Sequence, residues 1–68
     1  MALSARTRLT GTVTRIEHGD VVAEITLELE SGATVAGTIT ETSVRELELE
    51  TGDTATAVVK ATDVMFET

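Results

Sequence analysis

Hydrophobic and polar residues alternate along several short stretches of the chain. The clearest alternation spans residues 21–30, where glutamates and threonine lie between the apolar positions. The side chains expected on its buried face are Val21, Ala23, Ile25, Leu27 and Leu29. A period of two residues is typical of a strand with one buried face and one solvated face. Weaker alternation marks the other predicted strands, residues 9–16, 33–40, 54–60 and 64–66.

Turn signals and one helical segment separate these strands. His18-Gly19-Asp20 and Ser31-Gly32 predict turns, and Gly11 predicts a bulge within the first strand. Ser43-Val44-Arg45-Glu46 fits a capping box, with Ser43 at the N-cap and Glu46 at N3 of a short helix. The helix is expected to end before Thr51-Gly52-Asp53. Five strands and a helix after the third predict an all-β fold, a small OB-like five-stranded β-barrel.

The length and the missing cysteines point to self-association. A chain of 68 residues forms one small domain, residues 1–68, and buries only about 60% of its unfolded surface. Without cysteine it has neither disulfides nor a cysteine-based metal site, and a single histidine excludes a His-rich zinc site. The remaining means of stabilising so small a core is oligomerisation, so we expect a homo-oligomer.

The charge of the chain argues against a nucleic-acid or membrane partner. The formal net charge is −7, and the only aromatic residue is Phe66. Nucleic-acid binding relies on a basic surface and often on aromatic stacking. No apolar run approaches the roughly 20 residues of a membrane span. The N-terminal nine residues are too short and polar for a signal peptide, so we expect a soluble, cytoplasmic protein.

The few cations suggest where an anion would bind. Arg15 and Arg45 have carboxylates near them in sequence and are expected to form surface ion pairs. Lys60 differs because it ends a predicted strand and is followed by the free N–H groups of Ala61 and the hydroxyl of Thr62. Arg6 likewise lies among hydroxyls.

Three segments together therefore offer hydroxyls, N–H groups and cations, the cations coming from the first and the last. They are Ser4-Ala5-Arg6, Thr40 to Ser43 at the predicted helix start, and Lys60-Ala61-Thr62. A small tetrahedral oxyanion requires such a shell of donors, and a helix start favours anions. Simpler explanations remain open: Ser43 as an ordinary cap, Lys60 as a solvated strand end, and Ser4 and Arg6 as a frayed terminus.

The same segments resemble the molbindins, the stand-alone molybdenum-pterin-binding (Mop) domains of the TOBE group. The matching pieces are Ser4-Ala5-Arg6, Gly11-Thr12-Val13, Ala23-Glu24-Ile25, Leu27-Glu28-Leu29, Ile39-Thr40-Glu41-Thr42-Ser43-Val44 and residues 57–65. Their order and spacing cover essentially the whole chain. The chain departs from the family pattern at Thr7, Val22 and Thr62, where asparagine, asparagine and serine are usual.

The resemblance implies an OB-like barrel that binds molybdate, and often tungstate, in the cytoplasm. It further implies a homohexamer, a trimer of dimers, with anions held at subunit interfaces. The site residues that it implies, with backbone amides included, are Ser4, Ala5, Arg6, Thr40, Ser43, Val44, Lys60, Ala61 and Thr62. No side chain is expected to ligate the metal directly, and no organic cofactor is expected.

Nothing in the sequence indicates catalysis. His18 lies beside Asp20 in a predicted turn, without a serine or cysteine nucleophile placed near it. The function that the resemblance implies is molybdate or tungstate binding, and we interpret it as intracellular molybdenum storage and homeostasis, not an enzymatic activity. The alternative is a molybdate-responsive regulatory module that acts through a protein partner.

Overall fold

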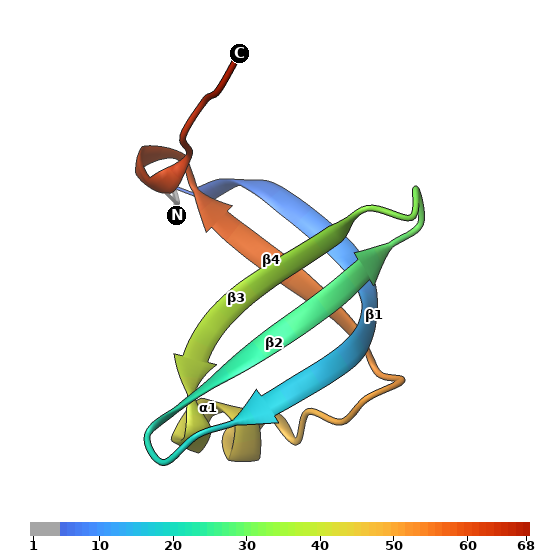
Figure 1. Cartoon of the computed structure of the whole chain (residues 1–68), viewed down its shortest axis with the longest axis vertical. Coiled ribbons are helices and arrows are strands. Elements are labelled where there is room, and N and C mark those ends of the chain that lie inside the picture. Colours follow the sequence, from blue (N-terminus) through green and yellow to red (C-terminus); the bar gives the residue numbers. More distant parts are fainter. Residues whose placement is uncertain (1–4) are drawn as a thin grey trace.

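Four antiparallel strands form one curled sheet in the computed structural model, which describes residues 5–68 (Figure 1). The elements in chain order are β1 (Ala5–His18), β2 (Val22–Leu29), β3 (Thr34–Thr40), α1 (Glu41–Leu47), β4 (Thr54–Lys60) and the 3-10 helix η1 (Ala61–Asp63). The strand order is β3-β2-β1-β4, so that β3 and β4 are the two edge strands. This confirms the predicted all-β fold with one short α-helix.

β1 joins the two halves of the sheet. Its first half pairs with β4 and its second half with β2, and Gly11 is opposite both Leu29 and Ala55. A Cβ at Gly11 would collide with the backbone carbonyl of Glu28, which explains the glycine. The irregularities of β1 lie between Ala5 and Thr7 and between Val13 and Arg15, so the predicted bulge at Gly11 was wrong.

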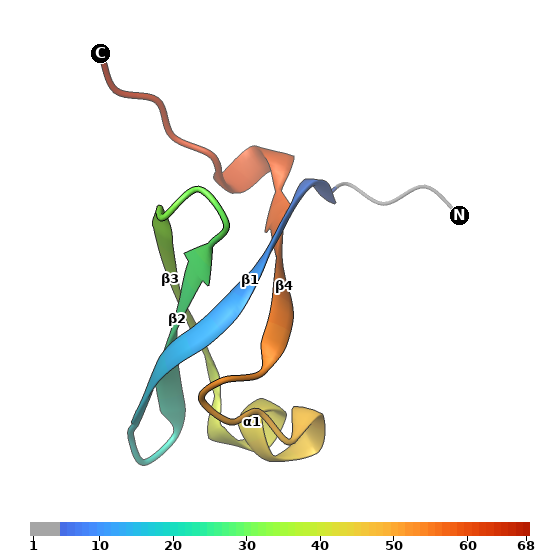
Figure 2. The ribbon, with the colours of Figure 1, turned by 90° about the vertical axis from the view of Figure 1, so that its right-hand side faces the viewer.

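Bulges bend a strand and increase its twist. With two of them, β1 curves and the sheet curls into half of a barrel (Figure 2).

The core is small and lies inside the curl. The buried hydrophobic residues among those described are Val13, Ala23, Ile25, Leu27 and Val44. Three of them come from β2 and confirm its predicted buried face. Val21 does not belong to that face, because it precedes β2 and is 72% exposed. A core of this size supports the expectation that the chain is only marginally stable alone.

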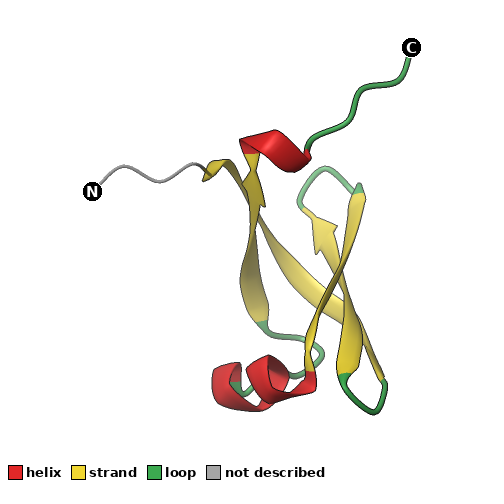
Figure 3. Ribbon diagram, turned by 90° about the vertical axis from the view of Figure 1, so that its left-hand side faces the viewer, coloured by secondary structure: helices red, strands yellow, loops and turns green. Residues whose placement is uncertain are grey.

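The helix α1 closes one end of the half-barrel (Figure 3). Its N-cap is Thr40, whose Oγ1 accepts a 3.0 Å hydrogen bond from the Ser43 N–H. The predicted N-cap at Ser43 was therefore wrong. The hydroxyl of Thr40 takes the cap because β3 ends there with extended backbone, which leaves Ser43 at the third helical position. Buried Val44 anchors the helix to the sheet.

The predicted fifth strand does not form within the single chain. After η1, residues 64–68 extend away from the sheet (Figures 1 and 2). A strand requires a hydrogen-bonded neighbour, and in the described part of the chain residues 64–66 pair with none. The sheet therefore has four strands instead of the five expected. No helix within residues 5–68 has the length and apolar character to cross a membrane.

Candidate functional site

The predicted site residues fall into two groups at opposite ends of β1 (Figure 1). Ala5, at the start of β1, is opposite Lys60 at the end of β4. Thr40 is opposite Val22, beside the end of β1. We call Ala5, Arg6, Lys60, Ala61 and Thr62 the strand-end cluster, and Thr40, Ser43 and Val44 the helix-start cluster. Ser4 lies outside the described residues. One chain therefore does not bring the predicted residues together.

The strand-end cluster presents a cation beside backbone that has left the sheet. Lys60 is exposed, and the ladder between β1 and β4 ends at its pairing with Ala5. Ala61 and Thr62 follow in η1, and both are exposed. Arg6 occupies the irregular position of β1 next to this pair. Among residues 7–68, whose side chains the structure describes, the ion pairs are Arg15–Glu17 and His18–Glu41, so Lys60 takes part in neither.

Arg8 belongs near this cluster and was not singled out from the sequence. It is exposed and opposite Val58, two residues before Lys60. Arg8 and Lys60 therefore share the outer face of the sheet as a diagonal pair, and such neighbours are typically about 7–8 Å apart, with their Cβ atoms somewhat closer. The position of Arg8 beside Lys60 could be recognised only once the register of β1 against β4 was known. The outer face at this end thus carries two cations.

The helix-start cluster offers fewer free donors than the sequence suggested. Thr40 Oγ1 donates its one proton to Ser43 Oγ at 2.9 Å and accepts from the Ser43 N–H, so it has no proton left to donate to an anion. The Val44 side chain is buried, and an N–H at the fourth helical position normally bonds to the N-cap carbonyl. Ser43, which is half-buried, retains its own hydroxyl proton for an external acceptor.

A carboxylate beside this cluster is held by a histidine. Both carboxylate oxygens of Glu41 lie 3.0 Å from His18 Nδ1, and Gly19 N–H donates to Oε2 at 3.0 Å. The hydrogen bond from His18 is the main cause that lowers the pKa of Glu41. Desolvation of the carboxyl raises it, but the Gly19 N–H and the charges of His18 and Arg45 also lower it, so the pKa of Glu41 lies below its ordinary value.

Sequence reasoning placed His18 in a turn and missed this contact. The two residues are 23 positions apart, and only the meeting of the β1 end with the start of α1 joins them. The predicted pair of Arg15 with Glu17 is confirmed, with Nη2 3.0 Å from Oε2.

Comparison with known proteins identifies the family. Residues 3–66 match the TOBE domain. The chain belongs to the TOBE domain family. This TOBE domain is 45% identical over 66 residues to molybdenum-pterin-binding protein 2 of Clostridium pasteurianum, and the match covers 97% of each chain. The resemblance to molybdenum-pterin-binding proteins stated from the sequence is confirmed.

Solved structures extend the similarity to the fold. A molybdate-binding protein from Sporomusa ovata superposes on this TOBE domain with a TM-score of 0.91 and 38% identity, over 100% of both chains. ModG, a cytoplasmic molybdate-binding protein solved with molybdate bound, matches with a TM-score of 0.84 and 49% identity. That match covers 90% of this TOBE domain and 43% of the ModG chain.

Proposed function

We propose that this TOBE domain binds molybdate, and tungstate by the same donors, as a free oxyanion. The observation that carries the proposal is its similarity, over nearly its whole length, to proteins named for molybdenum-pterin and molybdate binding. The exposed Lys60 beside the N–H groups of η1 supports it from the geometry. Binding, not catalysis, is the activity that we propose.

The proposed shell consists of charge, hydroxyls and amides. Arg6 and Lys60 supply the charge, with Arg8 as an added source. The hydroxyls of Ser4, Ser43 and Thr62 and the amides of Ala5 and Ala61 direct hydrogen bonds at the oxygens. Thr40 and Val44, whose donors bond within the chain, hold Ser43 and the helix start in place. Each charge-assisted hydrogen bond contributes about 1.5–3 kcal/mol, so several can offset the removal of water from a dianion. The size of a preformed shell would select molybdate and tungstate over the smaller sulfate.

We further propose that the complete site lies between copies of the chain. The strand-end and helix-start clusters are at opposite ends of β1, which supports a site that combines one cluster from each of two copies. A homohexamer built as a trimer of dimers, with five-stranded OB-like barrels, is the assembly that we propose. Its proposed role is molybdenum storage and homeostasis in the cytoplasm, and it requires no organic cofactor.

The test is calorimetric titration of the purified protein with molybdate, tungstate and sulfate at equal ionic strength. We expect tight binding of molybdate and tungstate and weak or no binding of sulfate. Equal, weak heats from all three anions would contradict the proposal. Elemental analysis and pterin fluorescence of protein purified from molybdate-grown cells distinguish free molybdate from a molybdenum-pterin as the bound ligand. Molybdenum without pterin supports the free oxyanion, and equimolar pterin overturns it.

A further inference from the structure

A carboxylate lies beside the Ser43 hydroxyl that the proposed shell uses. Glu41 is the first residue of α1 and stands two positions before Ser43, in the same helical turn. One turn rises about 5.4 Å, less than the roughly 8 Å over which a charge acts at physiological salt. The pKa of Glu41 lies below its ordinary value, so the carboxylate is ionised at neutral pH. An ionised carboxylate repels a bound oxyanion, so its charge bears directly on the affinity.

The turn between β1 and β2 holds this carboxylate in place. His18 Nδ1 lies 3.0 Å from both carboxylate oxygens of Glu41, and the Gly19 N–H donates to Oε2 at 3.0 Å. The Glu41 N–H donates to the Val21 carbonyl at 2.8 Å. The Glu41 side chain is 12% exposed, whereas that of His18 is 62% exposed. The carboxylate is therefore fixed and largely covered, while the imidazole ring stays in contact with water.

The hydrogen bond from His18 does not depend on the charge of the ring. An ionised carboxylate can only accept, so Nδ1 is the donor in the neutral ring as well as in the protonated one. The proton that is gained or lost is then that of Nε2, on a ring exposed to water. With a neutral ring the pair keeps the negative charge of Glu41, and with a protonated ring the pair is neutral overall. Protonation thus changes the charge beside Ser43 while the carboxylate stays in place.

Around this pair, His18 is the side chain that titrates near neutral pH. It is the only histidine of the chain, and histidine ordinarily changes charge between about pH 5 and about pH 8. The other titratable groups on the surrounding elements are carboxylates and guanidiniums, which ordinarily keep their charge over that range. They are Arg15 and Glu17 of β1, Asp20 of the turn, Glu24 of β2 and Arg45 of α1.

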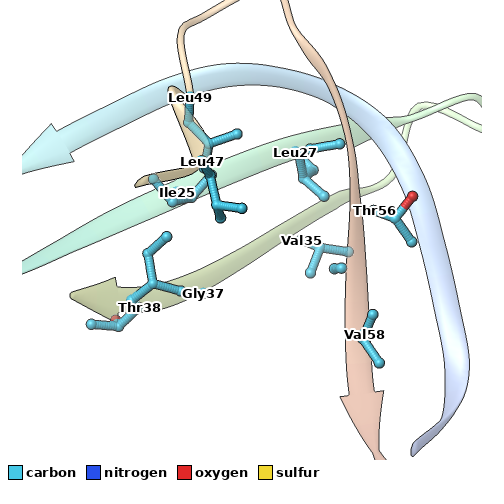
Figure 4. Close-up of a pocket in the computed structure, with 12 residues that line it drawn as sticks. Ile25, Leu27, Val35, Gly37, Thr38, Leu47, Leu49, Thr56 and Val58 are labelled. Atoms are coloured by element: carbon cyan, nitrogen blue, oxygen red, sulfur yellow. The ribbon is translucent and has the colours of Figure 1, made fainter. Parts of the chain in front are cut away.

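The apolar groove inside the curled sheet contributes no titratable group. It is lined by uncharged residues of β2, β3, α1, β4 and the segment after α1 (Figure 4). β3, which leads directly into Glu41, consists of uncharged residues from Thr34 to Thr40. The charge beside Ser43 over the neutral range therefore follows the protonation of His18.

We propose that His18 adjusts the affinity of the oxyanion site to pH by setting the charge beside Ser43. A protonated ring offsets the charge of Glu41, so the anion binds more tightly below the range in which the ring titrates. A neutral ring leaves that charge uncompensated, so the anion binds more weakly above that range. The inference rests on the proposed function, in which Ser43 donates to the anion. By linkage, the bound anion in turn favours the protonated ring.

The experiment is calorimetric titration of the full chain with molybdate at about pH 5.5 and about pH 8, on either side of the range in which histidine changes charge. We expect the affinity of the wild type to fall roughly 5-fold from the lower to the higher pH, the small end of the usual coupling between two sites. His18→Lys keeps a permanent cation and should bind tightly at both values. His18→Gln keeps a neutral donor and should bind weakly at both. Any effect of pH on molybdate itself is shared by all variants, so the readout is the ratio of their affinities.

Further measurements locate the effect in the pair. Glu41→Gln removes the charge of the carboxylate and should abolish the pH dependence, whereas Asp20→Asn removes a carboxylate outside the pair and should keep it. Circular dichroism at both pH values checks the fold of each variant. The ring C–H signals of the only histidine, followed by proton NMR, should titrate at higher pH when molybdate is bound.

The outcomes separate this inference from the proposed function. A pH dependence shared equally by wild type, His18→Lys and His18→Gln would overturn the inference and leave molybdate binding intact. A histidine titration that bound molybdate leaves unchanged would do the same. A wild type that binds no molybdate at either pH would overturn the proposed function, and the inference with it.

Discussion

Lys60 is the only lysine of the chain, and its surroundings differ from those of Arg15, which forms a surface ion pair. It is exposed at the end of β4, where the ladder stops, and takes part in neither described ion pair. Arg15, in contrast, contacts Glu17 at 3.0 Å. In a protein with net charge −7, an exposed cation beside freed N–H groups concentrates the local attraction for an anion.

Lys60→Ala is therefore predicted to weaken molybdate binding while the fold is kept. Loss of one charge-assisted hydrogen bond costs about 1.5–3 kcal/mol, which raises Kd roughly 10- to 150-fold. Calorimetric titration measures the affinity, and circular dichroism checks the fold. Arg15→Ala is the matched control, with unchanged affinity expected. If Lys60→Ala binds like the wild type, the lysine is misassigned.

Glu41 makes stability depend on pH at the acid end. Its pKa in the folded chain lies below the ordinary 4.5, so the unfolded chain binds the proton more tightly. The contribution to stability is complete above 4.5 and is lost as the pH falls through the lower folded pKa.

We expect the melting temperature to fall as the pH drops through this acid range, and Glu41→Gln to flatten the fall. Glu17→Gln, whose side chain is 59% exposed, serves as the control and should follow the wild type. Melting curves recorded from neutral to acid pH at constant ionic strength measure the effect. Parallel curves for wild type and Glu41→Gln would contradict the assignment.

At the scale of the element, α1 depends on one side chain at its start. The helix has seven residues and begins at the Thr40 cap, directly after β3. A helix this short has little stability of its own and relies on capping and on the burial of Val44.

Thr40→Ala is predicted to lower the free energy of unfolding by about 1 kcal/mol, the usual cost of a lost N-cap. Thr40→Ser should retain most of the stability, and Thr42→Ala, at an exposed position of the first turn, should change little. Urea denaturation at one fixed protein concentration measures the difference. An unaffected Thr40→Ala would show that the hydrogen bond to Ser43 does not stabilise the helix.

The sequence predicted the strands better than the helix start or the site. Alternation revealed the buried face of β2, and residues 54–60 coincide with β4. The helix start was misplaced because Thr40 and Ser43 are both hydroxyl residues one turn apart, and the end of β3 decides between them. That Lys60 and Ser43 lie at opposite ends of β1 could be seen only from the strand register, because spacing along the chain does not determine which strands pair.

At the scale of the whole molecule, ligand and assembly are expected to support one another. If molybdate lies between copies, it binds only the folded, assembled state and stabilises it by mass action. At 100 times Kd, one site contributes about 2.7 kcal/mol. For a domain of this size that corresponds to a rise in melting temperature of roughly 10–20 °C.

Differential scanning calorimetry with molybdate, and with sulfate at equal ionic strength, measures this rise. We expect it to grow with molybdate concentration and to be absent with sulfate. A melting temperature that molybdate leaves unchanged would contradict binding to the native state.

The separation of the strand-end and helix-start clusters along β1 has a consequence for gene dosage. On the proposed assembly, each chain carries half of each of two sites and therefore holds no complete site while it is dilute. The amount of molybdate bound would then rise more steeply than the amount of protein. A cell could release its stored molybdate simply by making less of the protein.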